Sequence, residues 1–575
     1  MPKELNFFGY FAEKLVLIQR CLSLFMKKIG LKFLVVLVLF VSCSKEDRDD
    51  RAINVVAPSQ TSSLAPSDST SDEPEITLST EINDFIWDEM NQYYYWQAEV
   101  PDLDDSMISN AYNYIEFLNR EPIPIDFFYG LLHSDDRNRF SNRPFSWIND
   151  DYEALEDQLS GISASDGMKF ILYARANGTG IIAAVSYVLP DSDAAEKGVV
   201  RGDLFNTING QEMTTQNYSN LLNSRGMQYS IGLINYDRTN DIVSSRDIEI
   251  TLEMEENFQE VPIHMKTVIE HGDDRVGYLM LNRFLSSVDS NDDGQADRNF
   301  NQEMVDAFAE LATENINELV VDLRYNGGGS VLNCVYLASL ITGQHTGEIF
   351  VKQLWNQKIM DYIDRVNSDA NSANDLDFND YFTNTAPDGS TFSGLNLRRI
   401  YVLTSRRTAS ASEMLINGLK PYMDEVVVIG EATYGKNVGS ITLKDYIDVE
   451  SPRDSLNPRH TYALQPIVIK VANVEDEADY VDGIQPDIEK LEVLTNYGTL
   501  GDQNEPMLEA ALLHMSNSGK GHSSSNALAL PSIVTAEEKQ LQQMVFDRPN
   551  MKIIDHFYTR KLTQKKNEST SGVQQ

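Results

Sequence analysis

The sequence predicts an α+β protein of several domains, in which a helical N-terminal domain and a small β domain precede a larger core of alternating strands and helices. Three observations lead to this prediction. The chain has 575 residues, which is enough for about three or four domains. Near the N-terminus, apolar residues recur three and four positions apart, as on one face of a helix. In the second half, β-rich runs end in glycine turns and lead into helical segments.

The composition indicates a globular protein and argues against some kinds of partner. Hydrophobic residues make up 42% and charged residues 23% of the chain, as in globular domains. The formal net charge of -40 argues against nucleic acid as a partner, because binding phosphates needs clustered Lys and Arg. The three cysteines, Cys21, Cys43 and Cys334, form neither a disulfide framework nor a CxxC zinc pattern.

A short apolar segment near the start predicts an exported protein. Residues 26–43, MKKIGLKFLVVLVLFVSC, place two lysines before an apolar run that is short for a membrane span. The end of the run resembles a bacterial lipoprotein box, which implies that Cys43 is lipidated and begins the mature chain. An ordinary signal peptide or an uncleaved anchor is the alternative. Residues 1–25 are superfluous if translation starts at Met26.

The region after Cys43 is predicted to be a tether. Residues 44–75 are rich in Ser, Thr, Pro, Asp and Glu, which favours a disordered acidic linker. The acidic residues directly after the cysteine resemble the surface-export signal of Bacteroidetes lipoproteins. We therefore expect a protein of the cell envelope, anchored to the outer membrane by its lipid on the periplasmic or the surface-exposed face.

Residues 76–155 are predicted to form the helical N-terminal domain. Thr80 is a candidate cap for a helix with one apolar face, formed by Ile82, Phe85, Ile86, Met90 and Tyr93. The aromatic run from Tyr94 to Trp96 favours packing between helices over a ligand-binding box. We expect no chemistry from this domain itself.

Residues 156–258 carry the turn pattern of a small β domain. A strand and a short helix ending at Gly198 precede a Gly202-Asp203 turn, another strand and an Asn209-Gly210 hairpin. This order resembles the PDZ domains of exported bacterial proteases, which bind a peptide C-terminus as an added strand. The resemblance implies that the carboxylate loop begins at Gly167, Met168, Lys169 and Phe170. A PDZ-like domain that serves only as a structural lid is the alternative.

Residues 259–515 form the predicted core, in which three segments each place a buried strand before a turn. The first, residues 318–330, ends in Asn-Gly-Gly-Gly-Ser; the second, residues 399–417, begins a helix near Ser410; the third, residues 426–436, delivers Lys436 on a loop. The glycines allow backbone amides to approach a ligand closely. A phosphate loop is disfavoured because its GK[ST] ending is absent.

Taken singly, these segments have plain structural interpretations. Ser410 is a candidate nucleophile because a helix N-terminus stabilises negative charge beside it, but it is equally a candidate helix cap. Lys436 alone is typical of a solvated surface charge.

Together, the three segments resemble the carboxy-terminal processing proteases, the tail-specific and tricorn-like serine peptidases. The family patterns Asp-Leu-Arg-x-Asn-x-Gly-Gly, Ser-Ala-Ser-Glu and Gly-Glu-x-Thr-x-Gly-Lys stand here at residues 322–329, 410–413 and 430–436. The fragment Asp482-Gly-Ile-Gln-Pro-Asp487 also matches. The resemblance extends over residues 76–515 and implies a crotonase- or ClpP-like ββα peptidase core.

The resemblance also implies a Ser–Lys dyad. Ser410 attacks the scissile carbonyl, Lys436 takes its proton and returns it to the leaving amine, and the amides of Gly328 and Ala411 form the oxyanion hole. A free lysine titrates near ~10.4, so this role requires surroundings dry enough to bring it to about 7–8.

One position departs from the family pattern. Many members carry Gln or Glu four residues after the lysine, where it orients the amine, whereas this chain has Ser440 there and Asn437 directly after the lysine. Either side chain is a candidate substitute through a hydrogen bond. Packing alone is the alternative.

Other patterns support no further site. Residues Asp289 to Asp297 imitate the start of a calcium loop, but Phe300 stands where such a loop needs Glu, which favours a solvated surface loop. The chain contains no HExxH and no GxSxG motif, which argues against a zinc protease and an α/β-hydrolase. Residues 516–575 are predicted to be a partly disordered tail.

The sequence therefore predicts a serine endopeptidase, without cofactor or metal, that acts on exported proteins or peptides with exposed C-termini. A non-catalytic, peptide-binding lipoprotein that has kept the PDZ groove is the second hypothesis. A crotonase-fold enzyme acting on a thioester is the third.

Overall fold

The computed structural model describes residues 74–518 apart from 138–142, 289–297, 369–375, 448–454 and 495. The predicted leader with Cys43, the tether up to residue 73, the calcium-like loop and the tail from residue 519 lie outside the described residues. Within the described part, no helix has the length and apolar character needed to cross a bilayer.

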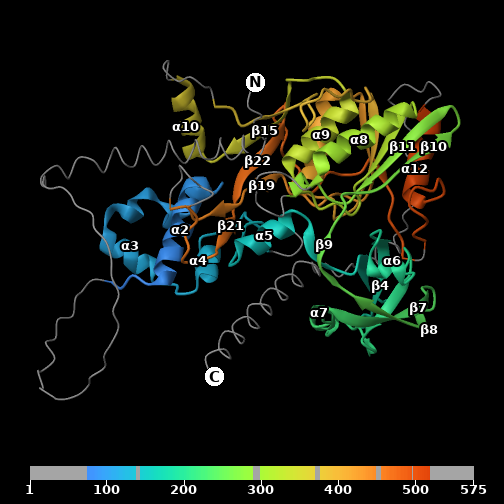
Figure 1. The fold of residues 1–575 in the computed structure, drawn as a ribbon, viewed down its shortest axis with the longest axis horizontal. Coiled ribbons are helices and arrows are strands. Elements are labelled where there is room, and N and C mark those ends of the chain that lie inside the picture. Colours follow the sequence, from blue (N-terminus) through green and yellow to red (C-terminus); the bar gives the residue numbers. More distant parts are fainter. Residues whose placement is uncertain are drawn as a thin grey trace, which may run out of the picture.

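The N-terminal helices form one end of the molecule (Figure 1). They are α2 (Leu78–Tyr93), α3 (Ala111–Leu118) and α4 (Pro124–Gly130). Three short 3-10 turns, Gln97–Glu99, Pro101–Leu103 and Asp105–Ser109, lie between α2 and α3. The cap of α2 is Thr77, not Thr80 as predicted. The Thr77 hydroxyl accepts a hydrogen bond from the Thr80 amide at 3.2 Å, and the Thr80 hydroxyl accepts one from the Thr77 amide at 2.9 Å. Thr80 is therefore the N3 residue of a capping box whose N-cap is Thr77.

This helical region shares one β-sheet with the core and lies beside a second sheet built from core strands. β1 (Trp147–Asn149) pairs antiparallel with β21 (Ala463–Gln465), which also pairs with β20 (Leu443–Lys444). A second sheet has the order β16-β15-β22-β19. Its strands are β16 (Asp380–Tyr381), β15 (Ile349–Trp355), β22 (Ile467–Asn473) and β19 (Val438–Ser440), and α10 (Gln357–Ser368) follows β15. Figure 1 shows β15, β22 and β19 between the N-terminal helices and the core.

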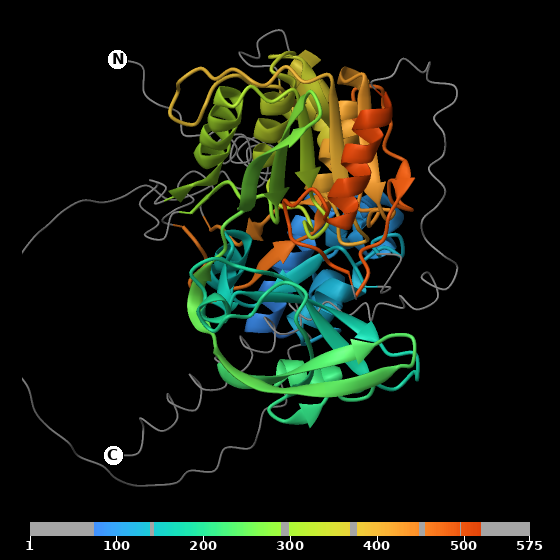
Figure 2. The same ribbon diagram turned by 90° about the vertical axis from the view of Figure 1, so that its right-hand side faces the viewer.

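The middle of the chain forms a separate β domain below the core (Figure 2). Its main sheet has the order β3-β4-β5-β7-β8, with β6 paired to β5, so β3 lies at an edge. The elements are α5 (Tyr152–Leu159), β2 (Ile162–Ser165), β3 (Met168–Ala174), β4 (Ile181–Val188), α6 (Asp193–Glu196), β5 (Leu204–Ile208), β6 (Gln211–Glu212), α7 (Tyr218–Asn223), β7 (Gln228–Asp237), β8 (Ile242–Glu253) and β9 (Glu255–Gln259). β9 pairs with β2. The domain boundary expected between residues 155 and 156 falls inside α5.

The core is a six-stranded sheet between two helical layers. The strand order is β10-β11-β14-β17-β18-β23, and all neighbours from β11 onward are parallel. Helices α8, α9 and α11 pack on one face and α12 on the other. The strands are β10 (Ile263–His271), β11 (Asp274–Leu281), β14 (Glu318–Asp322), β17 (Arg399–Thr404), β18 (Glu425–Gly430) and β23 (Ile488–Glu489). The helices are α8 (Phe300–Thr313), α9 (Val331–Thr342), α11 (Ala411–Leu419), the 3-10 turn Lys420–Tyr422 and α12 (Pro506–Ser518), and the small pair β12 (Ser287–Val288) and β13 (Arg298–Asn299) precedes α8.

This topology positions the three predicted segments. β14, β17 and β18 are adjacent parallel strands, so their carboxyl ends meet at one edge of the sheet. The glycine turn, the Ser410 turn and the Lys436 loop all leave from that edge.

Candidate active site

Ser410 lies in the turn between β17 and α11, in a backbone conformation that residues other than glycine seldom adopt. Its φ is 58° and its ψ is −116°. It is the N-cap of α11, whose first residue is Ala411. Strained conformations of this kind cost free energy and cluster at functional sites, where the surrounding structure enforces them.

The glycine turn after β14 packs directly against Ser410. A Cβ on Gly328 would stand 2.7 Å from the Cβ of Ser410 and 2.9 Å from the amide nitrogen of Ala411. The φ of Gly328 is +99°, a value that also favours glycine. The structure thus brings together three of the predicted site residues, Gly328, Ser410 and Ala411, and explains why the turn cannot carry a side chain here.

One predicted oxyanion donor is already engaged. The amide of Gly328 donates a hydrogen bond to Oδ1 of Asn326 at 2.8 Å. Asn326 is fully buried, its Nδ2 donates to the Leu281 carbonyl at 2.9 Å, and its own carbonyl accepts from the amide of Ala409 at 3.1 Å. The Asn326 side chain would have to release the Gly328 amide before that amide could stabilise an oxyanion.

Glu413 joins the Ser410 turn to the Lys436 loop. Its Oε2 accepts hydrogen bonds from the amides of Ser410 at 2.9 Å and Lys436 at 2.8 Å. Its Oε1 accepts from the Thr433 hydroxyl and the Gly435 amide, both at 2.6 Å. Burial raises the pKa of Glu413, and these four hydrogen bonds oppose the rise. In the sequence, Glu413 stands out only as part of a motif. It lies three residues after Ser410, which is the spacing of a capping box, and a capping box predicts a hydrogen bond from the Ser410 amide to the Glu413 side chain.

The loop that delivers Lys436 is fastened at several points. The amide of Thr433 donates to the Ile484 carbonyl at 3.0 Å, and its hydroxyl accepts from the Ile484 amide at 2.7 Å. A Cβ on Gly435 would stand 2.2 Å from the carbonyl oxygen of Val481. The Asp482–Asp487 fragment of the family pattern therefore has a structural role, because it braces the lysine loop.

An aromatic ring from the N-terminal region lies over the amine of Lys436. The Lys436 Nζ is 5.7 Å from the centroid of the Phe145 ring. The Phe145 and Tyr434 rings meet edge to face at 6.2 Å between centroids. No sequence pattern marks Phe145, since it lies far from Lys436 along the chain and in no motif. The ring brings no reactive group to the site, and the expectation that the N-terminal domain has no chemistry of its own stays a prediction.

The two candidates for orienting Lys436 lie close to it in sequence but differ in setting. Asn437 is buried, and its Nδ2 donates to the Ala478 carbonyl at 2.6 Å. Ser440 ends β19 and pairs with Ile467 of β22. A role in orienting Lys436 stays a prediction for both residues.

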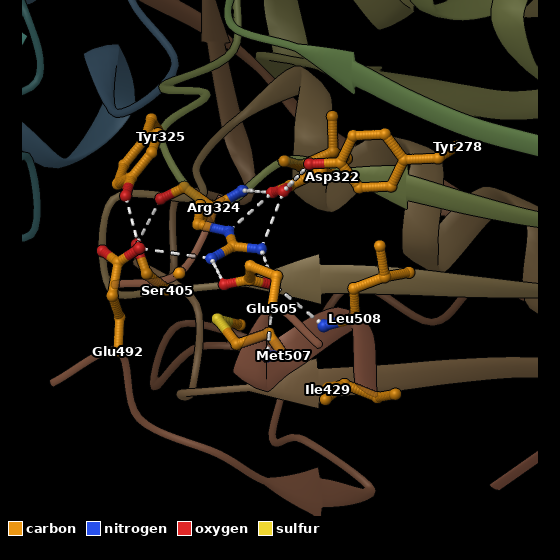
Figure 3. Close-up of polar contacts among 12 residues, drawn as sticks. Tyr278, Asp322, Arg324, Tyr325, Ser405, Ile429, Glu492, Glu505, Met507 and Leu508 are labelled. Atoms are coloured by element: carbon orange, nitrogen blue, oxygen red, sulfur yellow. Dashed lines mark hydrogen bonds and ion pairs between the residues drawn. The ribbon is translucent and has the colours of Figure 1, made fainter. Parts of the chain in front are cut away.

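A buried charge network supports the turn after β14 (Figure 3). The guanidinium of Arg324, 1% exposed, pairs with Asp322 at 2.9 Å and with Glu505 at 2.7 Å. Glu492 accepts hydrogen bonds from Arg324 at 3.2 Å and from the Tyr325 hydroxyl at 2.5 Å. The β domain joins this network through Arg201, whose Nη2 lies 2.5 Å from Glu492 Oε1. The glycine turn thus rests on charges that also hold the β domain against the core.

The residues predicted to bind a peptide C-terminus lie at the edge strand β3. Gly167 has a φ of +84°, and a Cβ there would stand 2.1 Å from the Ser192 hydroxyl. The amide of Met168 donates to Oδ1 of Asp166 at 2.8 Å. Lys169 pairs with Glu260 at 3.7 Å, and the ring of Phe170 packs edge to face on Phe205 at 5.3 Å. The edge position of β3 is the one that strand addition requires.

Comparisons of the sequence with known proteins point to one family. The model of peptidase family S41 matches residues 275–489, and the model of the peptidase S41 N-terminal domain matches residues 81–147. A "Probable CtpA-like serine protease" of Staphylococcus saprophyticus is 24% identical over 260 residues, which span 44% of this chain and 42% of that protein. Its namesake in Staphylococcus aureus strain N315 is 25% identical over 209 residues, spanning 35% and 34%. The chain thus spans less than half the length of the curated relatives it matches.

The fold is shared with a solved structure. A crystal structure of a "Putative S41 protease" from Bacteroides fragilis has a TM-score of 0.56 to this chain at 27% identity. The match covers 76% of this chain and 97% of that one. The similarity therefore extends well beyond the segments that carry the motifs.

Proposed function

The chain belongs to peptidase family S41, the carboxy-terminal processing serine peptidases, and on that premise we propose that it is an endopeptidase whose nucleophile is Ser410 and whose general base is Lys436. The observation that carries the proposal is the close packing of Gly328 against Ser410 and Ala411. A Cβ added at Gly328 would stand 2.7 Å from the Ser410 Cβ and 2.9 Å from the Ala411 amide nitrogen. That packing sets two backbone amides beside a serine at a helix N-terminus, where an oxyanion is stabilised.

The proposed reaction is acyl transfer through a covalent intermediate. Lys436 takes the hydroxyl proton of Ser410 as the oxygen attacks the scissile carbonyl, and the proton passes to the leaving amine when the C–N bond breaks. Water then repeats the attack on the ester and frees Ser410. The amide of Ala411 and, once Asn326 releases it, the amide of Gly328 are the proposed donors to the oxyanion.

The finer fold assignments belong to the same proposal. We propose that the β3-β4-β5-β7-β8 domain is PDZ-like and that the core is of the crotonase or ClpP-like ββα type. The edge position of β3 and the Asn209-Gly210 hairpin support the first assignment. A substrate C-terminus would add as a strand beside β3. Its carboxylate would lie at Gly167 and Met168 once their amides leave the Ser165 hydroxyl and Oδ1 of Asp166.

The test compares wild type with Ser410→Ala and Lys436→Ala on an unfolded protein that ends in an apolar C-terminus, and on the same protein with an amidated C-terminus. We expect cleavage by wild type alone and faster cleavage of the free carboxylate. Equal cleavage by all three proteins would refute the dyad. Equal rates on the two substrates would refute recognition of the C-terminus.

A non-catalytic peptide binder is the second candidate, and the hydrogen bond from Gly328 to Asn326 favours it. It predicts no cleavage by wild type but retained binding of a labelled peptide with a free C-terminus, measured by fluorescence anisotropy. Gly167→Ala would weaken that binding, because the added Cβ would collide with Ser192.

We also propose that the mature protein is held at the outer membrane by a lipid on Cys43. The lipoprotein-box sequence before that residue supports this assignment. Metabolic labelling with a radioactive fatty acid tests it: wild type should incorporate label and Cys43→Ser should not. Label in Cys43→Ser would contradict the anchor.

A further inference from the structure

The N-terminal region supplies one wall around the amine of Lys436. The Phe145 ring lies with its centroid 5.7 Å from Nζ and meets the ring of Tyr434, two residues before the lysine, edge to face. A cation within about 6 Å of an aromatic face is attracted by the ring quadrupole, whereas a neutral amine is not.

The backbone at Phe145 is anchored by a buried carboxylate. Oδ1 of Asp136 accepts hydrogen bonds from the amides of Phe145 at 2.8 Å and Ser146 at 3.0 Å. Its Oδ2 accepts one from the Tyr94 hydroxyl at 3.0 Å, and Asp136 itself has no exposed surface. These three hydrogen bonds hold the backbone at Phe145 in place, and with it the position of the ring.

The segments that carry Phe145 and Lys436 both hydrogen-bond to the same strand, β22. The amide of Ile467 in β22 donates to the Ser146 hydroxyl at 2.8 Å, one residue from Phe145. Ile467 pairs with Ser440 of β19, the strand that follows Lys436. Its carbonyl accepts from the amide of Tyr95 at 2.8 Å. One residue of β22 therefore aligns the N-terminal region with the lysine loop.

We propose that Phe145 is a positioning residue for Lys436 and takes over the part of the Gln or Glu that this chain lacks at Ser440. The inference rests on the proposed function, since it concerns the base of that reaction. Lys436 must become an ammonium when it accepts the Ser410 proton and an amine again when the leaving group takes it. The ring exchanges no proton; it holds the side chain and favours the ammonium form at the moment that form appears.

The decisive comparison is Phe145→Leu with Phe145→Trp. Leucine keeps an apolar side chain in the site but removes the aromatic face, whereas tryptophan offers the strongest face. For Phe145→Leu we expect a roughly three- to tenfold lower kcat, little change in KM, and an acid limb of the pH–rate profile displaced by roughly half a unit to lower pH. Phe145→Trp should keep the acid limb at the wild-type pH or displace it slightly to higher pH.

A matched control separates this role from simple support of the helical domain. Phe117 is buried in the same domain, where it packs on the ring of Phe127 at 5.5 Å. Phe117→Leu removes a ring from that core without touching Lys436, so it should leave the pH–rate profile in place. The proposal is overturned if Phe145→Leu leaves kcat and the limb unchanged, or if Phe117→Leu displaces the limb as much.

A second measurement does not depend on cleavage. In the Ser410→Ala protein, the pH dependence with which cyanate modifies Lys436 is followed by peptide mass spectrometry, with the partly exposed Lys352 as internal reference. Adding Phe145→Leu should displace the Lys436 midpoint by roughly half a unit and leave Lys352 in place. An unmoved midpoint overturns the inference even where wild type cleaves. Absence of cleavage by wild type, with a displaced midpoint, refutes the proposed function instead.

Discussion

Glu413 accepts a hydrogen bond from the backbone amide of Lys436 at 2.8 Å, and through it the lysine loop is tied to the serine turn. The same oxygen accepts the amide of Ser410 at 2.9 Å. The two segments leave neighbouring parallel strands, β17 and β18, whose pairing fixes where the loops begin but not where they end. The Tyr434 amide, which donates to the Thr408 carbonyl at 2.9 Å, ties the two loops once. The buried carboxylate of Glu413 ties them a second time, at Ser410 and Lys436 themselves.

The first prediction is that Glu413→Gln loosens this link. One carboxylate oxygen becomes an amide nitrogen that faces two N–H or O–H donors, so at least one buried donor loses its partner. We expect the free energy of unfolding to fall by about 2–4 kcal/mol and kcat to fall by about 100-fold, because small displacements of reacting groups are costly. Urea unfolding and steady-state kinetics measure the two effects.

Glu509→Gln is the control for this substitution, since Glu509 is exposed on α12. It should leave both quantities within error of wild type. If Glu413→Gln cleaves as fast as wild type, Glu413 does not set the geometry of the dyad.

The second prediction concerns the contact between Gly328 and Ser410. Gly328→Ala places a methyl group 2.7 Å from the Ser410 Cβ and from the Ala409 carbonyl oxygen, so the two turns must separate. Loss of one oxyanion donor costs about 100- to 1,000-fold in kcat, and we expect a loss of that size. The comparison variant is Gly347→Ala, which also has a positive φ, +83°, but meets no atom within 4 Å. Similar losses of kcat in both variants would assign the effect to backbone strain and not to the contact.

The sequence predicts the parts of the site that are local. β14, β17 and β18 are recognisable because each buried strand runs into a turn with its own glycine or helix-start signal, and their order matches a family pattern. The error at α2 is also local: Thr77 and Thr80 both carry hydroxyls suited to a capping box, and only the path of the preceding chain decides which one caps.

Contacts across the fold escape such reasoning. Phe145 and Lys436 are brought together by β1, β21 and β22, and pairing of strands from opposite ends of a chain leaves no periodic trace in either segment. The hydrogen bond between Gly328 and Asn326 escapes for another reason, because the sequence shows which amides are near the nucleophile but not which of them already have an acceptor.

The third prediction is a strong coupling between Arg201 and Glu492 across the contact between the β domain and the core. Their side chains are 9% and 12% exposed, and the N···O distance is 2.5 Å. After either substitution the remaining charge keeps a second partner, since Glu492 still faces Arg324 at 3.2 Å and Arg201 still faces Glu505 at 3.7 Å. Arg201→Met or Glu492→Gln alone should therefore cost about 1.5–3 kcal/mol, the range for a hydrogen bond to a charged group. The double variant should cost clearly less than the sum of the two. A double-mutant cycle on unfolding free energies measures the difference.

The pair Arg398 and Asp424 provides the reference for that cycle. Its N···O distance is also 2.5 Å, but its side chains are 81% and 59% exposed. Exposed pairs are worth about 0–1 kcal/mol. An Arg201–Glu492 coupling as small as this reference value would contradict a buried interdomain ion pair.

The fourth prediction gives the pH dependence of the same contact. Burial alone would raise the pKa of Glu492, but the charges of Arg201 and Arg324 and the Tyr325 hydroxyl outweigh burial, so that pKa lies below its ordinary value of 4.5. Asp322 and Glu505, which also pair with Arg324, are further carboxylates facing this cluster. Because the pKa is lower in the folded state, the unfolded chain takes up the proton first as the pH falls. The stability due to Glu492 is therefore complete above pH 4.5 and is lost below it.

Glu492→Gln cannot titrate, so it isolates this contribution from all other carboxylates. The difference in unfolding free energy between wild type and Glu492→Gln should be constant from about pH 7 down to the ordinary glutamate range and should shrink at lower pH. Urea unfolding followed by circular dichroism at several pH values measures that difference. A difference that grows on acidification would mean that burial wins over the two arginines, and that the contact between the β domain and the core is stabilised by a protonated Glu492.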